Sequence, residues 1–124
     1  MKKYLLLEDI SSYKISFSLS NYIWDIVTKW DYFAKRTVGQ QLVESVDSIS
    51  ANIAEGFGRY FKKDKINFYR YSFGSLKESF DWINKAEKRK LLTKEQCEYI
   101  TKELNKLPVE INHLISYTDT KLTK

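Results

Sequence analysis

The 124-residue chain carries 21 lysines and arginines against 16 aspartates and glutamates, for a net charge of +5. This length fits one domain with a single core, and a composition of 43% hydrophobic and 15% aromatic residues excludes a disordered chain. Four glycines and one proline provide few turn signals, which favours long helices over many short strands. We therefore expect an all-α fold, formed as one domain over residues 1–124.

The chain has one cysteine, Cys97. A lone cysteine cannot form an intrachain disulfide or a cysteine-ligated metal site, which fits a reducing cytoplasm. The apolar run at residues 4–7 is too short for the apolar region of a signal peptide. No stretch approaches the roughly 20 apolar residues of a membrane span. We expect a soluble, cytoplasmic protein.

Apolar residues recur every three or four positions in four segments, which is the period of a helix with one buried face. These segments span residues 11–30, 37–57, 64–88 and 93–118. Thr37, Asp64 and Thr93 are expected N-caps, and Thr93 should form a capping box with Gln96. Because the connections are short, consecutive helices should pack antiparallel in an up-down-up-down bundle.

Pro108 lies inside the fourth segment. There it removes the backbone bond to the Leu104 carbonyl, which costs about 3 kcal/mol in an unkinked helix. The apolar spacing continues beyond the proline, so we expect a kink rather than a helix end. Burial of about twenty apolar side chains, each contributing about 1.5–3 kcal/mol, can offset this cost.

The run NIAEGFGR (52–59) places an acid, two glycines and an arginine together. A dinucleotide-binding loop needs three glycines between a strand and a helix, so that helical amides point at the phosphate. Here the glycines end a predicted helix, whose C-terminal carbonyls repel anions. We expect Gly58 to be the left-handed residue that ends the helix, and Gly56 to let a neighbouring helix approach closely. Glu55 is expected to pair with Arg70 of the third helix.

Enzymatic patterns are incomplete in this chain. Glu110 and His113 show the Glu-x-x-His spacing of di-iron bundles, but such a site needs two of these motifs and two more glutamates. A single histidine excludes the site within one chain and leaves open one shared between subunits. Cys97 lies on the predicted core line, and no serine has a nearby histidine, so no nucleophile has a base. We expect no enzyme, no catalytic residue, no metal and no cofactor.

Basic residues concentrate at two predicted turns. The second-turn cluster comprises Arg59, Lys62, Lys63 and Lys65, and the third-turn cluster comprises Lys88, Arg89 and Lys90. In an up-down bundle the two clusters lie at opposite ends, and Lys35 and Arg36 join the third-turn cluster. Aromatic residues near the second-turn cluster that could stack on unpaired bases are Tyr60, Phe61, Tyr69 and Tyr71. The alternative is that these cations complement helix dipoles and keep the chain soluble.

The runs SISANIAEGFGR (48–59) and FYRYSFGSLKE (68–78) together resemble the four-helix bundle proteins encoded within intervening sequences of bacterial 23S ribosomal RNA genes. The matching positions are Asn52, Glu55, Gly56, Arg59, Gly74, Ser75 and Glu78. The resemblance implies a left-handed up-down bundle that assembles as a homo-oligomeric ring, commonly a pentamer. It also implies kinship with the accessory proteins of diversity-generating retroelements, whose basic bundles contact nucleic acid and a reverse transcriptase. It implies packing and hydrogen-bonding roles for these residues, and no enzymatic activity.

Two functions remain open from the sequence. The first is a non-enzymatic, oligomeric bundle that binds RNA or DNA through the basic clusters, with an affinity that falls steeply with salt. The second is a protein–protein scaffold or adaptor ring, in which aromatic residues off the core, such as Trp82 and Tyr99, would form subunit contacts. A third, metal-dependent oxidation through Glu110 and His113, would require bound iron.

Overall fold

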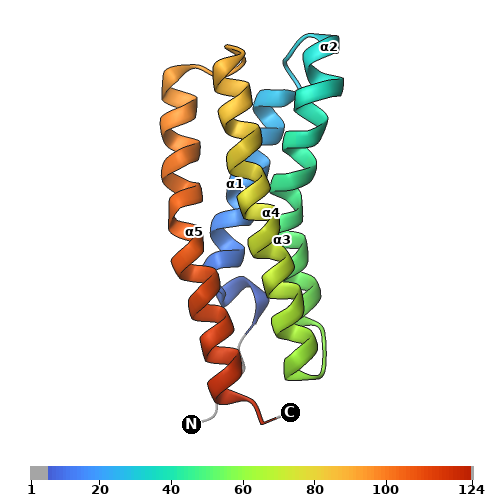
Figure 1. The fold of residues 1–124 in the computed structure, drawn as a ribbon, viewed down its shortest axis with the longest axis vertical. Coiled ribbons are helices and arrows are strands. Elements are labelled where there is room, and N and C mark those ends of the chain that lie inside the picture. Colours follow the sequence, from blue (N-terminus) through green and yellow to red (C-terminus); the bar gives the residue numbers. More distant parts are fainter. Residues whose placement is uncertain (1–5, 124) are drawn as a thin grey trace.

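The computed structural model describes residues 6–123. Its long helices are α1 (Ser11–Val27), α3 (Gln40–Phe57), α4 (Lys62–Lys88) and α5 (Lys94–Lys121). The shorter elements are η1 (Leu7–Asp9), α2 (Tyr32–Ala34) and η2 (Lys35–Gly39). Figure 1 shows the long helices running alternately up and down, so that α1 begins and α5 ends at the same end of the bundle. The predicted all-α, four-helix architecture is confirmed, and its left-handedness stays a prediction.

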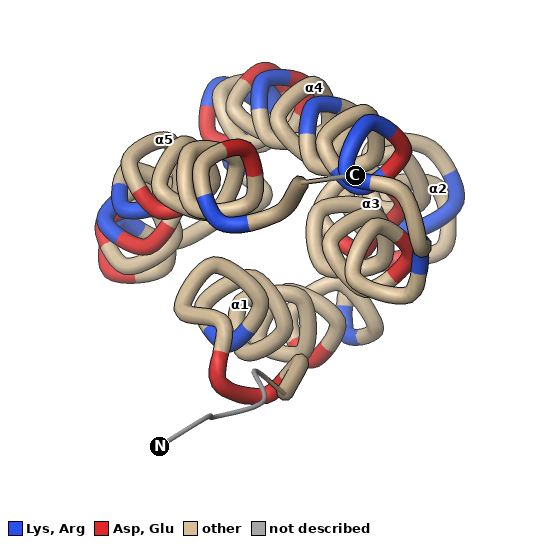
Figure 2. The backbone as a smooth tube through the Cα atoms, turned by 90° about the horizontal axis from the view of Figure 1, so that it is seen from below, with Lys and Arg blue, Asp and Glu red and all other residues tan. Residues whose placement is uncertain are grey.

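The core lies along the bundle axis, where the four long helices face one another (Figure 2). The leucine, isoleucine and valine side chains that are 2% exposed or less are Leu19, Ile23, Leu42, Val46, Ile49, Ile53, Leu76, Ile83, Ile100, Leu104, Leu107 and Ile111. Within each helix they recur mainly three or four positions apart, which is the period read from the sequence. Burial of each such side chain contributes about 1.5–3 kcal/mol, so the stripes determine which residues become helical.

The helical path into α3 begins earlier than the sequence predicts. The N-cap is Asp31, whose Oδ1 accepts a hydrogen bond from the Ala34 amide at 3.0 Å. Thr37, the predicted cap, lies within the π-helical turn η2, and its hydroxyl donates to the Phe33 carbonyl at 2.6 Å. The prediction was wrong because the helical path already begins after Asp31, whose carboxylate accepts from a free amide well before Thr37.

Two other boundaries differ, and one cap is confirmed. α1 ends at Val27 rather than at residue 30, and α4 begins directly after Phe61, its N-cap residue, rather than after Asp64. Asp64 instead lies in the first turn, where its charge favours the helix dipole. The predicted capping box is present. The backbone amide of Gln96 donates to Thr93 Oγ1 at 3.1 Å, and the backbone amide of Thr93 donates to Gln96 Oε1 at 2.9 Å.

Helix α5 is continuous through Pro108. This confirms that the proline does not end the helix, while a kink stays a prediction. Buried leucines precede Pro108 at positions 104 and 107, and Ile111 and Leu114 follow it. Core contacts on both sides therefore hold the helix together where one backbone hydrogen bond is missing.

Helices α3 and α4 make the most extensive interhelical contact, and they approach closely at Gly56. A Cβ at Gly56 would lie 2.7 Å from Cε1 of Tyr69 and 3.0 Å from both the Lys65 carbonyl oxygen and the Phe68 Cβ. Any side chain at this position would displace the ring or the backbone of α4. The packing role predicted for Gly56 is supported by this geometry.

A buried hydroxyl joins the same two helices farther along. Ser72 of α4 is fully buried and donates to the Ile49 carbonyl of α3 at 2.8 Å. Tyr69, one turn earlier, is 2% exposed. Burial raises the pKa of Tyr69 to about 12, an effect that the neighbouring Thr118 hydroxyl of α5 partly offsets. Tyr69 therefore lies where α3, α4 and α5 meet.

Gly58 is not the left-handed residue that the sequence suggested, because its φ is −78° and its ψ is −8°. Among the described non-glycine residues, positive φ occurs at Lys90, with φ of 60°. The Leu91 amide donates to the Ala86 carbonyl at 2.9 Å, and the Lys90 amide donates to the Glu87 carbonyl at 3.0 Å. This Schellman pattern ends α4 with a lysine where glycine is usual.

Two alanine substitutions within the same motif should shift stability in opposite directions. Gly56→Ala should lower the free energy of unfolding by about 1–3 kcal/mol, because the new methyl group overlaps the Tyr69 ring. Gly58→Ala should raise it by about 0.4–1 kcal/mol, because the backbone there is right-handed and alanine restricts the unfolded chain. Urea unfolding of both variants measures the difference. Equal effects would contradict the close approach at Gly56.

Stability should fall above pH 10 through Tyr69. Below pH 10 a tyrosine is neutral in both states, whereas between pH 10 and about 12 only the unfolded chain ionises at this position, so stability declines across that window. Between pH 9 and 11 the Tyr69→Phe variant should lose less free energy of unfolding than the wild type, and the difference should be on the order of 1–2 kcal/mol. The control is Tyr117→Phe, which removes an exposed tyrosine and keeps Tyr69. Urea unfolding at both pH values tests this, and identical slopes for both variants would contradict it.

Candidate nucleic-acid interface

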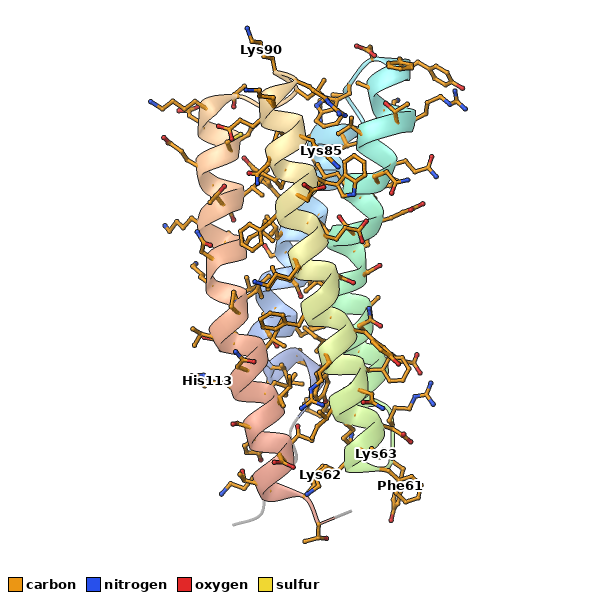
Figure 3. The ribbon with its side chains drawn as sticks, viewed as in Figure 1. Phe61, Lys62, Lys63, Lys85, Lys90 and His113 are labelled. Carbon is orange, nitrogen blue, oxygen red and sulfur yellow. The ribbon has the colours of Figure 1, made fainter. Side chains whose placement is uncertain are left out.

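The two basic clusters lie at opposite ends of the bundle, as predicted. Figure 3 shows Lys62 and Lys63 at one end, with Lys85 and Lys90 at the other. The first end holds the connection between α3 and α4, and the second holds the connection between α4 and α5. The side chains of the two clusters make very different contacts.

In the second-turn cluster, Arg59 is already paired. Its Nε donates to Glu55 Oε2 at 2.9 Å, and its guanidinium carbon lies 4.6 Å from the centroid of the Phe68 ring. Among the described residues, Glu55 thus pairs with Arg59, and the predicted pair with Arg70 is wrong. Arg70 instead lines a surface pocket to which Asp119 of α5 also contributes.

Two lysines of the second-turn cluster bind backbone carbonyls. Lys65 Nζ donates at 2.7 Å to the carbonyl of Phe57, the last residue of α3, and burial lowers the pKa of Lys65. Lys62 Nζ donates to the Asp119 carbonyl at 3.1 Å and lies 3.6 Å from its carboxylate. A helix end has free carbonyls that such cations satisfy. Of this cluster, Lys63 alone has no ion pair or side-chain hydrogen bond within residues 6–123.

The third-turn cluster is free of such contacts. Lys88, Arg89 and Lys90 are exposed, and none of them makes an ion pair or a side-chain hydrogen bond to another described residue. One turn earlier, Lys85 pairs with Asp81 at 2.7 Å. The dipole at the end of α4 favours these cations, but their charges remain available to an external anion.

A cavity of about 650 Å³ opens beside the third-turn cluster. It lies where α2, η2 and the start of α3 meet the end of α4, and its lining comprises Asp31, Phe33, Ala34, Arg36, Thr37, Val38, Gln41, Trp82, Arg89 and Leu91. Ligand pockets typically measure about 300–1,000 Å³ and combine apolar walls with a few polar groups, as this one does. Here the polar groups include two arginines.

Two residues of the cavity lining, Arg36 and Trp82, take part in cation–π contacts. The Arg36 guanidinium carbon lies 5.6 Å from the Tyr32 ring centroid, and Lys85 Nζ lies 4.3 Å from the Trp82 ring centroid. Phe33 is 73% exposed. The π-helical turn η2 carries Arg36 to this edge, and π turns are frequent at functional sites. The predicted grouping of Arg36 with the third-turn cluster is confirmed, since Arg36 and Arg89 line one cavity.

The sequence pattern does not predict this cavity, and it places the aromatic stacking faces at the opposite end of the bundle. Of those rings, Tyr69 is buried and offers no face to a base. Tyr60 packs edge-on against Phe61, with the ring centroids 5.0 Å apart. The signal available in the sequence was the pair Tyr32-Phe33, which one alanine separates from Lys35 and Arg36. It pointed to the site only once the end of α4 was known to lie beside it.

The remaining matched positions make contacts within their own helices. Asn52 Nδ2 donates to the Ser48 carbonyl at 2.9 Å. The Ser75 carbonyl accepts a hydrogen bond from the serine one turn later at 2.8 Å. Glu78 Oε2 accepts from Trp82 Nε1 at 3.2 Å, which holds the indole at the edge of the cavity. A Cβ at Gly74 would meet no described atom within 4 Å.

The residues weighed for catalysis lie on α5. His113 is exposed on α5, while burial raises the pKa of the Cys97 thiol, helped by the charges of Glu87 and Glu98. Within residues 6–123, no three His, Cys, Asp or Glu side chains are grouped to hold a metal ion. Over the same range, no helix combines the length and apolarity that crossing a bilayer requires.

The comparisons with known proteins agree with this fold. One solved relative is a protein of unknown function from the S23 ribosomal protein family of Bacteroides thetaiotaomicron. It is 20% identical in sequence, the alignment covers 84% of this chain and 97% of the other, and the TM-score is 0.73. No curated protein matches the chain significantly. The family model described as 23S rRNA-intervening sequence protein matches residues 8–113, and the chain therefore belongs to the 23S rRNA-intervening sequence protein family.

Proposed function

We propose that this protein is a non-enzymatic, oligomeric bundle that binds RNA or DNA at the end of the bundle where α4 finishes. The observation that carries the proposal is the third-turn cluster, in which three adjacent cations lack an internal partner among the described residues. Phosphates supply the countercharge that these cations lack. The second-turn cluster contributes less, because three of its four members already bind carbonyl or carboxylate oxygens.

The cavity beside this cluster adds chemistry that lysines alone would not provide. Arg36 and Arg89 come from different segments and meet at one opening. Arginine binds phosphate through two parallel N–H groups and also stacks on flat rings. The grouping of these arginines with exposed aromatic rings is typical of surfaces that hold single strands.

The alternative function is a protein–protein scaffold ring. It is favoured by Gly74, an exposed residue in the middle of α4. Glycine costs about 0.5–1 kcal/mol relative to alanine inside a helix, and no described neighbour within 4 Å requires it. Tyr71, one turn earlier, is 58% exposed. A second copy of the chain that packs closely on this face would explain both residues.

Neutralising the third-turn cluster should weaken nucleic-acid binding and its dependence on salt. The test variant is the triple Lys88→Gln, Arg89→Gln, Lys90→Gln, measured by fluorescence anisotropy with a labelled single-stranded RNA of about 12 nucleotides. Between about 50 and 200 mM salt, the slope of log K against log salt should become shallower by about 2, since each phosphate contact on a single strand contributes about 0.7.

The matched control carries the same loss of charge on the sides of the bundle: Lys14→Gln, Lys77→Gln, Lys102→Gln. All three lysines are exposed, and binding by this variant should stay near that of the wild type. Equal weakening in both triples would show that only net charge matters. Absence of wild-type binding at about 50 mM salt would reject nucleic-acid binding, and light scattering of Gly74→Leu, with a loss of the oligomer, would then support the ring.

A further inference from the structure

We infer that the cavity between η2 and the end of α4 receives one unpaired nucleobase of a single strand, stacked on Phe33, while Arg36 and Arg89 contact the flanking phosphates. This inference rests on the proposed function and goes further, because it names single-stranded nucleic acid and the position where a base is held. It rests on the shape, lining and charge of the cavity.

The cavity has walls suited to a flat ring. Phe33 is 73% exposed and lines the opening together with Trp82, Val38 and Leu91. A side chain this apolar and this exposed gains by covering its face with another ring. Every base has such a face, and stacking on an aromatic side chain tolerates any sequence.

The polar groups of the cavity suit the edge of a base and its phosphates. The lining contains two arginines and one aspartate, so its charge favours an anionic ligand. One carboxylate oxygen of Asp31 is occupied by the Ala34 amide. The Thr37 hydroxyl donates its proton to the Phe33 carbonyl and keeps acceptor capacity for a base amino group. Gln41 adds both a donor and an acceptor.

The positions of the arginines favour a strand over a free protein side chain. Arg36 enters from η2, and Arg89 enters from the residue that follows α4. A base between them would have its 5′ and 3′ phosphates near the two guanidinium groups, and the third-turn cluster would continue the cationic path. An apolar peptide side chain could fill the cavity but would leave these cations without counterions. A base within a duplex is covered on both faces, so it cannot enter.

The test compares two exposed phenylalanines at opposite ends of the bundle. Phe33→Ala removes the proposed stacking face, and Phe61→Ala removes a ring that is 55% exposed beside the second-turn cluster. Anisotropy is measured with single-stranded RNA, single-stranded DNA of the same sequence, the matched duplex RNA and a labelled mononucleotide. Phe33→Ala should weaken single-strand binding at least fivefold, consistent with loss of one stacked base, and leave duplex binding unchanged. Phe61→Ala should change neither.

A second readout follows the cavity directly. Trp82 lines it, so single-stranded RNA should quench the tryptophan emission of the wild type, and Trp82→Phe should lose most of that quenching. Circular dichroism checks that each variant keeps the helical fold. The ratio of RNA to DNA affinity identifies the preferred type of strand. Tight binding of the mononucleotide would show that the ligand is a free nucleotide rather than a strand, and would overturn the inference.

The remaining outcomes separate the two proposals. If single strands and duplex bind equally and Phe33→Ala affects neither, phosphate binding by the third-turn cluster stands and the base site fails. If Phe61→Ala, rather than Phe33→Ala, weakens single-strand binding, the stacking site lies at the opposite end and the inference fails. If the wild type binds no nucleic acid, both proposals fail.

Discussion

The contact between the Tyr69 ring and the backbone at Gly56 sets the spacing of α3 and α4, and other features of the bundle depend on it. The ring occupies space that a Cβ would need, so α4 can lie closer to α3 than ordinary side chains permit. The bond from Ser72, one turn after Tyr69 on α4, to the Ile49 carbonyl of α3 then holds the same pair farther along. With these helices fixed against each other, the beginning of one and the end of the other lie together. The cavity between Arg36 and Arg89 follows from that alignment.

Positive charge has different roles at the two ends of this bundle. At the connection between α3 and α4, free carbonyls and carboxylates are close enough for Lys62 and Lys65 to bind them. These lysines act as caps: Lys65 binds a backbone carbonyl, and Lys62 binds a carbonyl and lies 3.6 Å from the Asp119 carboxylate. At the connection between α4 and α5, a tight Schellman turn satisfies the last carbonyls through backbone amides. Side-chain cations are therefore not needed there, and they stay exposed to solvent.

The helices could be predicted from the sequence because burial repeats with the helical period, and that repeat is local. The errors arose where the outcome depended on competition between groups or on distant parts of the chain. Asp31, rather than Thr37, is the cap because the helical path begins six residues earlier than periodicity indicates. Glu55 found Arg59 four residues away, whereas a pair with Arg70 required an inter-helix register that periodicity cannot give. The residue with positive φ proved to be Lys90 rather than Gly58, so the presence of glycine did not identify the strained turn.

The cationic residues of the candidate site could be predicted from the sequence, but its aromatic residues could not. Its cations could be found by counting charges at predicted turns, and the grouping of Arg36 with residues 88–90 follows from up-down topology. The aromatic half could not be found in this way. Phe33 belongs to a segment without helical periodicity, and the cavity exists only because that segment folds as α2 and η2 against the end of α4. Only the folded chain shows that one aromatic face belongs with these arginines.

The π turn at residues 35–39 lies between α2 and α3 and sets the rotation of α2 about the helix axis relative to α3. A π turn contains about one residue more than an α turn, so loss of a single residue there would restore regular helix and swing Asp31 and Phe33 by about 100° around the axis. Residues after the turn, including Gly56, would keep their places. A one-residue deletion there would thus reshape the mouth of the cavity and would also move Ala34, which is 8% exposed, so its packing cost falls on this end of the bundle alone.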